Sequence, residues 1–483
     1  MLGHALYLSA LALLVLILPL QQLSAHAGLA ATVGLIGAWR YGWGLVNFVR
    51  AHVFIRLVHP ARRKAAEARY RQQTIPAHAF FLVTSFKIEP EISTRVYRSV
   101  FAAAKASRGD ATIIASVVEA ADERLIRRLY ELTPGMAEKT RLIIDRIPGT
   151  GKRDALATSL RLIAGQCPGE RDIVILVDGD SCPPIDIVER TAPYFTEPGV
   201  GALTTDERCE VSKGRLFRHW FNLRFTQRQM MMSSMGLSRR ILTLTGRMSV
   251  FRANLACNGD FIRCVEHDSL EHWRLGRVTF LTGDDKSTWF WLLRNGWLML
   301  YLPDVASLSM ETQPKPGFVP SAVTLMVRWF GNMLRTNGRA LALGPRRIGA
   351  FTWWSLLDQR ISMWTTLLGP ATVMAAAALI DPVILPAYIA WVLATRYVYC
   401  LAMVSFRPAF PISYPFLLYF SQVVGAAVKT YVLFRLDRQK WTRQSGTRHT
   451  TRPPLPTHLK NLSSSYLHAL ATAWLLLAAF ALS

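Results

Sequence analysis

Residues 175–181 read ILVDGDS, and this stretch decides the fold. A run of β-branched and aliphatic residues over 173–178 leads without interruption into the Asp-Gly-Asp motif at 178–180. Short apolar runs that end in turn residues are typical of strands buried on both faces of a sheet. The two carboxylates therefore fall at the carboxyl end of a predicted strand, the edge at which open α/β sheets bind ligands.

Similar apolar runs alternate with amphipathic segments between about 75 and 310. The predicted strands are 79–85, 111–118, 141–145, 173–178 and 298–302, and the predicted helices are 91–106, 121–132, 152–165 and 285–295. This alternation indicates an α/β fold in which helices cover both faces of a parallel sheet, an architecture that suits nucleotide binding.

The composition points to a membrane protein. Hydrophobic residues make up 51% of the 483 residues and charged residues 18%, with 14 Trp, a balance that is unusual for a wholly water-soluble fold. The net charge of +24 suits nucleic acid, the anionic cytoplasmic leaflet, or an anionic substrate or product. We expect no nucleic acid partner, because the chain carries no recognisable nucleic-acid-binding motif. The six cysteines lack CxxC or zinc-type spacing and are expected to be free thiols.

Two apolar runs open the chain, at 5–20 and about 28–49. A signal peptide is the alternative for the first, but no basic segment precedes it and a second hydrophobic run follows directly. The loop between the runs lacks Lys and Arg, whereas 50–71 is crowded with both. The positive-inside rule therefore places the chain after residue 50 in the cytoplasm.

Four more apolar stretches lie near 362–380, 383–405, 411–434 and 465–482. If all four crossed the membrane, the basic segment 435–449 would lie outside, against the positive-inside rule. We therefore expect 411–434 to lie along the membrane surface, as we expect for the amphipathic stretch 319–342. The predicted segments are two spans in 1–50, a cytoplasmic domain in 51–310, interface helices in 311–361, two spans in 362–406, an interfacial helix and loop in 407–460, and a last span in 461–483.

Asp178 and Asp180 are the first candidates for chemistry. Two carboxylates separated by one glycine can jointly hold a divalent cation, because hard cations prefer oxygen ligands and glycine lets a phosphate approach closely. Mg²⁺ or Mn²⁺ held there would stabilise the diphosphate of a sugar nucleotide as leaving group. The alternative interpretation is a polar turn after a buried strand.

A second signal is LTGDDKSTWFWLLRNGW over 281–297, in which Asp284 and Asp285 stand at a predicted helix start. The helix dipole stabilises a carboxylate there, so one interpretation is capping. The other makes Asp285 a general base that takes the proton from an acceptor hydroxyl during sugar transfer with inversion.

The third signal is Arg328-Trp329 in the amphipathic stretch. An indole can stack on the apolar face of a pyranose, and a neighbouring guanidinium can neutralise a diphosphate. At a membrane surface, however, such a pair is also typical of an interfacial anchor.

The order of these motifs resembles that of the processive family-2 glycosyltransferases, which make cellulose, chitin, hyaluronan and alginate. Within this family, 283–297, 328–347, 352–364 and 434–444 are similar to the mannuronan synthases, the catalytic subunits of alginate polymerases. The resemblance covers about residues 30–450. It implies a cytoplasmic GT-A type, Rossmann-like domain joined to an α-helical transmembrane channel domain in the bacterial inner membrane.

The resemblance also implies roles for individual residues. Asp178 and Asp180 become ligands of the metal and the diphosphate, and Asp285 becomes the catalytic base. Asp284 stands beside that base where the family usually has Glu. The remaining matches are Lys152 in GTGKRDAL facing the donor, Arg328 and Trp329 at the end of the QxxRW motif contacting diphosphate and acceptor sugar, 243–252 beside the acceptor, and Trp441, Thr442 and Arg443 in the gating loop that closes over nucleotide.

Two further departures from the family pattern bear on the donor. Leu325 occupies the place of the Gln in QxxRW. The Asp-Asp-Gly-Ser that holds uracil in UDP-sugar enzymes is replaced by SVVEAADE over 116–123, where Glu119 is the one candidate for contacting the base. The loss of the uracil signature favours a GDP donor, as a mannuronan synthase would use.

The function implied is metal-dependent, inverting, processive transfer of mannuronate from GDP-mannuronate onto a growing polysaccharide that passes through the lipid bilayer. A separate cyclic-di-GMP-binding membrane co-polymerase subunit is implied as partner. Two alternatives remain open: a synthase of cellulose, chitin or hyaluronan type that uses a UDP-sugar, and an inactive scaffold subunit of an exopolysaccharide secretion complex. The basic charge suits an acidic polymer, although positive-inside positions and lipid binding explain most of it.

Overall fold

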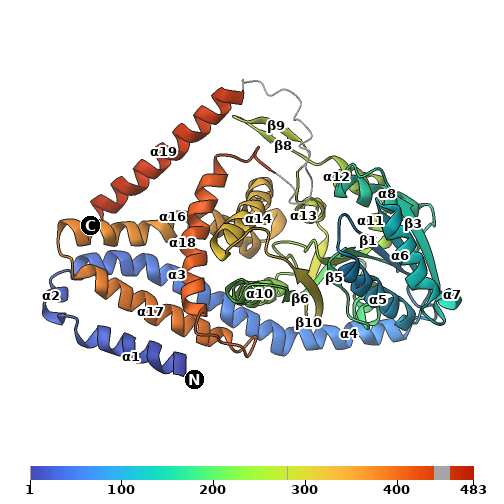
Figure 1. The fold of residues 1–483 in the computed structure, drawn as a ribbon, viewed down its shortest axis with the longest axis horizontal. Helices are drawn as coiled ribbons and strands as arrows, with labels where there is room; N and C mark the ends of the chain where they lie inside the picture. Colours follow the sequence, from blue (N-terminus) through green and yellow to red (C-terminus); the bar gives the residue numbers. More distant parts are fainter. Residues whose placement is uncertain (1, 280, 440–456) are drawn as a thin grey trace.

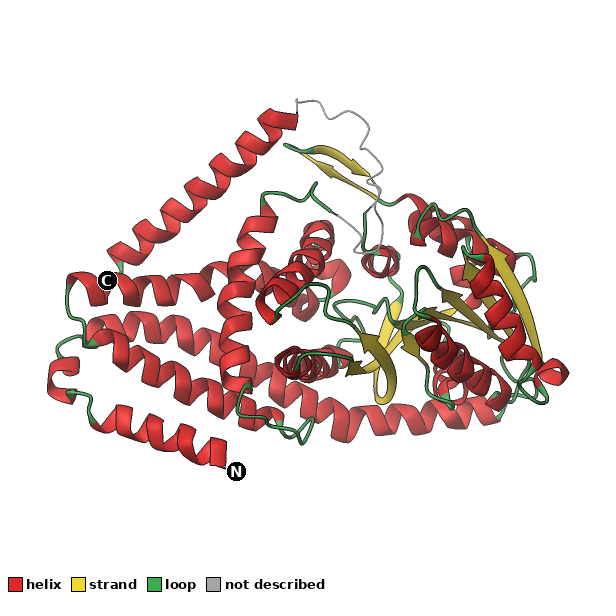
Figure 2. Cartoon of the chain, in the orientation of Figure 1, coloured by secondary structure: helices red, strands yellow, loops and turns green. Residues whose placement is uncertain are grey.

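The computed structural model of the chain describes residues 2–279, 281–439 and 457–483 (Figure 1). A sheet-containing domain lies at one end. Helices alone make up the other end, which holds α16 (Ala350–Leu379) and α17 (Ile384–Met403) (Figure 2). The predicted combination of an α/β domain with a helical membrane region is therefore confirmed.

Eight strands form one sheet, in the order β3-β2-β1-β4-β7-β6-β10-β5. Their bounds are β1 Ala79–Thr84, β2 Ala111–Val117, β3 Thr140–Arg146, β4 Ile173–Asp178, β5 Ser181–Cys182, β6 Val200–Val211, β7 Met248–Arg252 and β10 Leu298–Glu311. The neighbouring strands β3, β2, β1 and β4 run parallel to one another, as predicted. β7 runs antiparallel to both β4 and β6, and β5 runs antiparallel to β10. The prediction of a wholly parallel sheet is therefore wrong, and the sheet is mixed.

β6 was missed because its second half is polar. Glu207 is only 1% exposed, yet it sits in the strand because Arg228 and Arg247 pair with it at 3.3 and 3.4 Å. Burial of a charge is tolerated when partners of opposite sign surround it. A strand that is buried through ion pairs has no apolar run by which sequence reasoning could find it.

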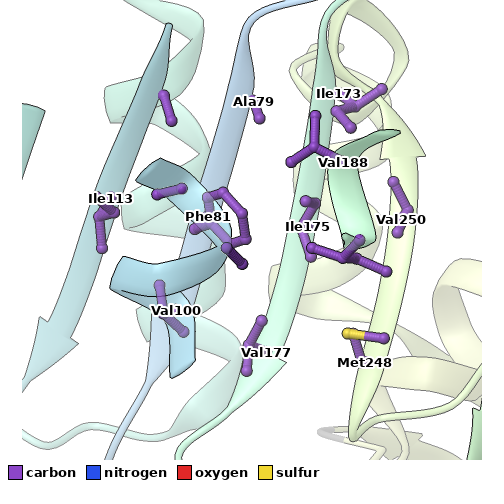
Figure 3. Packing of buried hydrophobic residues seen from close by; sticks show 14 of the residues in the cluster. Ala79, Phe81, Val100, Ile113, Ile173, Ile175, Val177, Val188, Met248 and Val250 are labelled. Atoms are coloured by element: carbon purple, nitrogen blue, oxygen red, sulfur yellow. The ribbon is translucent and has the colours of Figure 1, made fainter. Parts of the chain in front are cut away.

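Alternate residues of the central strands face two separate cores, because successive side chains in a strand point to opposite faces. Phe81 and Val83 of β1 belong to the core shown in Figure 3, which α5 (Pro90–Ala106) and α6 (Ala120–Glu131) cover. Phe80 and Leu82 face the other core, under α8 (Lys152–Ala164), α12 (Gly259–His267) and α13 (Asp284–Arg294). Together the two cores fix the strand ends on which the site is built.

The N-terminal region is helical. α1 (Leu2–Leu16) and α2 (Leu20–Ser24) precede α3 (Ala27–Val53), which continues through a π-helical turn (Phe54–Val58) into α4 (His59–Arg71). One long helical segment thus leads from the bundle to the sheet domain (Figure 1), where α4 packs on the 3₁₀ helix Ala192–Thr196. The remaining short elements are α7 Met136–Lys139, α9 Ile187–Thr191, α11 Ala253–Ala256, α15 Pro345–Ile348 and the hairpin β8 Ser269–His272 with β9 Gly276–Thr279.

Four helices among the described residues are long and apolar enough to cross a membrane. They are α16, α17, α18 (Tyr414–Leu433) and α19 (Thr457–Ala481), whose qualifying part is Leu459–Ala481. α1 is apolar but shorter, at 15 residues. The chain is therefore a membrane protein whose described candidate spans follow the sheet domain.

Length and composition do not separate α18 from the spanning helices, but its direction differs. Figure 1 shows α18 running across α3, α16 and α17 rather than along them. It packs on α10 (Arg215–Gly236) and α14 (Phe318–Leu341), which also lie between the bundle and the sheet domain. This direction suits a helix on the membrane surface, which remains our prediction for 411–434.

Candidate active site

A cavity of about 380 Å³ opens beyond the carboxyl ends of β1, β2 and β4, the edge expected from the topology. Its walls come from these strand ends, the start of α8, the end of β10 and one face of α14. The lining residues include Thr84, Ser85, Ser116, Val118, Ile147, Gly149, Gly151, Lys152, Asp178, Gly179, Asp180, Glu311, Leu325 and Arg328. Four of the predicted site residues thus meet around one space: Lys152, Asp178, Asp180 and Arg328.

Lys152 links the two acidic motifs. Its Nζ lies 2.5 Å from Oδ1 of Asp178 and 3.1 Å from Oδ2 of Asp284, so a single ammonium joins the Asp-Gly-Asp strand to the start of α13. Burial by itself lowers the pKa of Lys152, but the two carboxylates outweigh it, so the pKa is raised and the side chain stays charged. The predicted meeting of the DxD and DD motifs is therefore seen in the structure.

The loop before Lys152 needs glycine. Gly149 and Gly151 have φ of +70° and +140°, values that L side chains rarely adopt, and both line the cavity. The N-terminal turn of α8 follows directly, so the positive end of its helix dipole lies at the cavity wall. This wall is suited to an anionic group such as a diphosphate.

The surroundings of Asp178 raise its pKa. Burial raises its pKa to about 6, and the neighbouring charges of Asp180 and Asp284 act in the same direction, against the ammonium of Lys152. Between the two motif carboxylates, the Gly179 amide donates a hydrogen bond to the Thr84 carbonyl at 2.9 Å. The end of β4 is thus held tightly against the end of β1.

Asp285 lines a small hollow next to the main cavity. Thr84, Lys152, Asp178 and Asp284 also line this hollow, whose volume is about 20 Å³. Burial raises the pKa of Asp285, and the charge of Asp284 raises it further. A carboxyl whose pKa is raised in this way is better suited to accept a proton near neutral pH.

The capping interpretation of the DD motif is not supported in its simple form. The N-cap of α13 is Gly283, which has no side chain that could cap the helix. Asp284 instead directs its carboxylate to Lys152. Both aspartates nevertheless lie in the first turn, where the helix dipole favours their charged forms.

Arg328 shares the cavity wall with Glu311, a group that sequence reasoning missed. The Nη2 of Arg247 lies 2.7 Å from Oε1 of Glu311, which lines the cavity. Burial lowers the pKa of Arg328, while Glu311, Asp178 and Asp180 act to raise it. Glu311 ends β10 at the same sheet edge as the DxD motif, so a longer predicted strand would have found it.

Part of the region 243–252 lies beside the site, and its role beside the acceptor stays a prediction. A Cβ built on Gly246 would stand 3.7 Å from Oδ2 of Asp178 and 3.8 Å from Nζ of Lys152. Thr84 and Ser85, at the end of β1, are further lining residues that the sequence did not single out. Like Asp178, they lie at the carboxyl end of a strand, where open α/β sheets bind ligands. A Thr-Ser pair directly after an apolar run is the sequence signal that could have identified them.

Trp329 and Glu119 lie elsewhere. Trp329 is not among the described residues that line the cavity; it stacks on Trp220 with ring centroids 5.7 Å apart, under the guanidinium of Arg224. Glu119 precedes α6 and is likewise absent from the described lining, although Val118 is part of it. The positions Trp441, Thr442 and Arg443 fall outside the described residues.

A divalent cation fits the site only together with a substrate. Among the described residues no group of three or more His, Cys, Asp and Glu side chains could hold a metal ion. Asp178 and Asp180 nevertheless both face the cavity. Mg²⁺ is commonly held by one or two carboxylates plus substrate phosphates and water, so two carboxylates beside an open cavity are a sufficient protein contribution.

Comparison with known proteins gives concordant results. A family model described as glycosyltransferase like family 2 matches residues 76–332. The chain is 43% identical over 413 residues to glycosyltransferase alg8 of Pseudomonas syringae pv. tomato, covering 85% of this chain and 83% of that protein. It is 42% identical over 476 residues to glycosyltransferase alg8 of Azotobacter vinelandii, covering 98% and 96%.

Among solved structures, the chain resembles the mannosyltransferase PcManGT from Pyrobaculum calidifontis in complex with GDP-Man and Mn²⁺. The TM-score is 0.51 and the identity 18%, and the match covers 83% of this chain and 98% of that one. At this identity the likeness bears on the fold alone, and it agrees with the α/β domain described above.

Proposed function

Because the chain belongs to glycosyltransferase family 2, with the alg8 glycosyltransferases among its relatives, we propose that it polymerises mannuronate from GDP-mannuronate into polymannuronate, the alginate precursor. The chain is a glycosyltransferase with a GT-A-like domain. The observation that carries the proposal is the position of Lys152, whose ammonium pairs with Asp178 at the end of the DxD strand and with Asp284 at the start of the DD helix. A donor diphosphate and an acceptor hydroxyl can thus be bound on either side of the same group.

In the proposed reaction, the donor diphosphate occupies the main cavity, where Arg328 and the first turn of α8 offset its charge. Asp285 accepts the proton of the acceptor hydroxyl as that oxygen attacks the anomeric carbon from the face opposite the diphosphate, so the configuration inverts. Mg²⁺ or Mn²⁺, when bound at Asp178 and Asp180, adds positive charge that stabilises the leaving diphosphate. Asp284 holds Lys152 in place between the two halves of the site.

The donor base is proposed to be guanine. The wall near β2 is built from Ser116, Val118, Ile147 and Gly149, and no carboxylate of the described residues contributes to it there. The uracil-holding acidic pair of UDP-sugar enzymes therefore has no equivalent in this wall. Glu119, the neighbour of Val118, remains our candidate for contacting the donor base.

The product is proposed to leave through the helical region, with α18 on the cytoplasmic surface and five spans in the bacterial inner membrane. This topology keeps the basic segment 435–449 in the cytoplasm, consistent with the positive-inside rule. The proposed gating loop at Trp441 to Arg443 then lies on the same side as the donor cavity. A cyclic-di-GMP-binding membrane co-polymerase subunit is the proposed partner.

Donor competition tests the substrate. The purified full-length chain, in lipid nanodiscs with Mg²⁺ or Mn²⁺, is titrated with labelled GDP-mannuronate against unlabelled GDP-mannuronate, UDP-glucose and UDP-N-acetylglucosamine. We expect GDP-mannuronate to displace the label at least tenfold more effectively than either UDP-sugar, about 1.4 kcal/mol of discrimination. Equal displacement by a UDP-sugar would favour the cellulose, chitin or hyaluronan type of synthase instead.

A further inference from the structure

Two positively charged side chains lie on adjacent aromatic residues of α14. The guanidinium of Arg224, on α10, lies 4.4 Å from the ring centroid of Trp329 and 5.1 Å from that of Trp220. The ammonium of Lys429, on α18, lies 4.8 Å from the ring centroid of Phe330. The helices α10, α14 and α18 lie between the sheet domain and the bundle (Figure 1), and they bring the two cations to neighbouring aromatic residues.

Neither cation has a carboxylate partner among the described residues. Two other half-buried cations, by contrast, are paired: Arg407 with Asp206 at 2.8 Å, and Arg40 with Asp358 at 2.5 Å. The charge of Asp358 reaches Lys429, but its carboxylate is already bound by Arg40. Uncompensated charge in the interior is costly, so a pair of such cations calls for an anion that is supplied from outside the chain.

The charges nearest to Arg224 make its position more unfavourable still. Burial lowers the pKa of Arg224 to about 10, and the charge of Arg247 acts in the same direction. Arg224 and Lys429 are also close enough to repel each other. Cation–π contacts with Trp329 and Phe330 offset part of this cost.

The location connects this pair to the catalytic cavity. Arg328 lines the donor cavity, and Trp329 and Phe330 follow it directly in α14. The two cations therefore contact the residues that follow Arg328 in α14, a helix that also packs on α18. A polymer that leaves the catalytic centre for the bundle would pass this surface.

We propose that Arg224 and Lys429 bind a carboxylate of the growing polymer whose sugar ring packs on Trp329 and Phe330, and so select a polyuronate over a neutral chain. The inference rests on the proposed function, because it takes the product to be an acidic polymer and proposes that two residues outside the donor cavity bind its carboxylates. Guanidinium and ammonium groups form charge-assisted hydrogen bonds with carboxylates, and aromatic faces accept the apolar face of a pyranose. Anionic lipid headgroups are the competing source of negative charge, but the aromatic side chains of Trp329 and Phe330 beside the two cations favour a sugar.

Binding of short oligomers to the full-length chain tests the proposal. The chain is placed in nanodiscs of neutral phosphatidylcholine, and calorimetry compares trimannuronate with the same trisaccharide after reduction of its carboxyls to alcohols. We expect the wild type to bind the acidic trisaccharide about ten- to a hundredfold more tightly, the range for hydrogen bonds to charged groups. Arg224→Gln and Lys429→Gln should each reduce that preference, and the double variant should abolish it.

Controls separate this role from a structural one. Arg218→Gln removes an exposed cation from the same helix α10 and should leave the preference unchanged. Arg224→Lys keeps the charge and should retain part of the preference. Binding of GDP-mannuronate, measured for every variant, reports on folding and on the donor cavity.

Three results would overturn the inference: equal binding of the two trisaccharides by the wild type, an undiminished preference in the double variant, or an effect of the variants confined to nanodiscs that contain anionic phosphatidylglycerol. The last would assign the cations to lipid. These outcomes are distinct from failure of the proposed function, which the donor competition decides on the wild-type chain alone.

Discussion

Gly179→Ala is a direct test of how the site is held. A Cβ at this position would lie 2.9 Å from the Thr84 carbonyl oxygen and 2.8 Å from Oγ of Ser85. Ser85 could turn its hydroxyl away, but the Thr84 carbonyl is backbone and already accepts the Gly179 amide. Since Thr84 and Asp178 are neighbours in the paired strands β1 and β4, the added methyl must push the DxD turn away from β1.

The size of the effect follows from these distances. Ordinary contact with a Cβ begins near 3.4 Å, so the turn must shift by about 0.5 Å. Overpacking of this kind typically costs about 1–3 kcal/mol. A misplacement of about 1 Å can cost about a hundredfold in rate, so we expect roughly a tenfold loss in kcat/KM for polymer synthesis.

The assay is incorporation of labelled mannuronate into polymer by membranes that contain equal amounts of each variant. The matched control is Gly165→Ala, at the end of α8, where the new Cβ would meet backbone oxygens only at 3.6 and 3.7 Å and activity should be unchanged. If Gly179→Ala membranes synthesised polymer at the wild-type rate, the close approach of the DxD turn to β1 would not be what positions the carboxylates.

Three further predictions concern the charged groups around the site. Asp285→Asn should abolish polymer formation without changing membrane insertion, and undiminished synthesis would favour the scaffold alternative. Asp284→Asn removes a charge that raises the pKa of both Asp285 and Asp178. Because activity falls as these two groups are protonated, the variant should stay active to lower pH than the wild type. An unshifted acid limb of its kcat/KM profile would contradict this. Arg153→Met removes buried hydrogen bonds to the Val265 carbonyl at 2.5 Å and to the Ser287 hydroxyl at 2.7 Å, so the Tm should fall by several degrees. Arg161→Met, which breaks only an exposed pair, should change the Tm little in the same scanning fluorimetry.

The sequence predicted the first half of the sheet because that half is apolar. β1 to β4 and the helices between them fall within a residue or two of the predicted ranges, since each strand is a short hydrophobic run followed by turn residues. β6 and β7 were not predicted. Their pairing depends on buried ion pairs and on an antiparallel return of the chain, and neither leaves a periodic signal.

The candidate site was predicted as a set of motifs rather than as a geometry. Strand-end placement was enough to bring Asp178 and Asp180 to the cavity, whereas Lys152, which joins the DD motif to them, was expected only from the family resemblance. Glu311 was missed because the expected strand 298–302 stopped nine residues short of the end of β10. Residues that act from a long strand or a helix face cannot be assigned before the pairing partners are known.

Net charge proved a weaker guide than local pairing. The excess of +24 says little by itself, because many cations are tied to carboxylates, as Arg247 is to Glu311 and Lys152 is to Asp178. The informative cations are those that the fold leaves without such a partner, at a place where we propose that the product passes. Arg224 and Lys429 meet both conditions, so the affinity of this enzyme for an acidic chain should depend on two residues and not on the overall charge. Removing several exposed arginines while keeping these two should therefore leave the preference for the acidic trisaccharide intact.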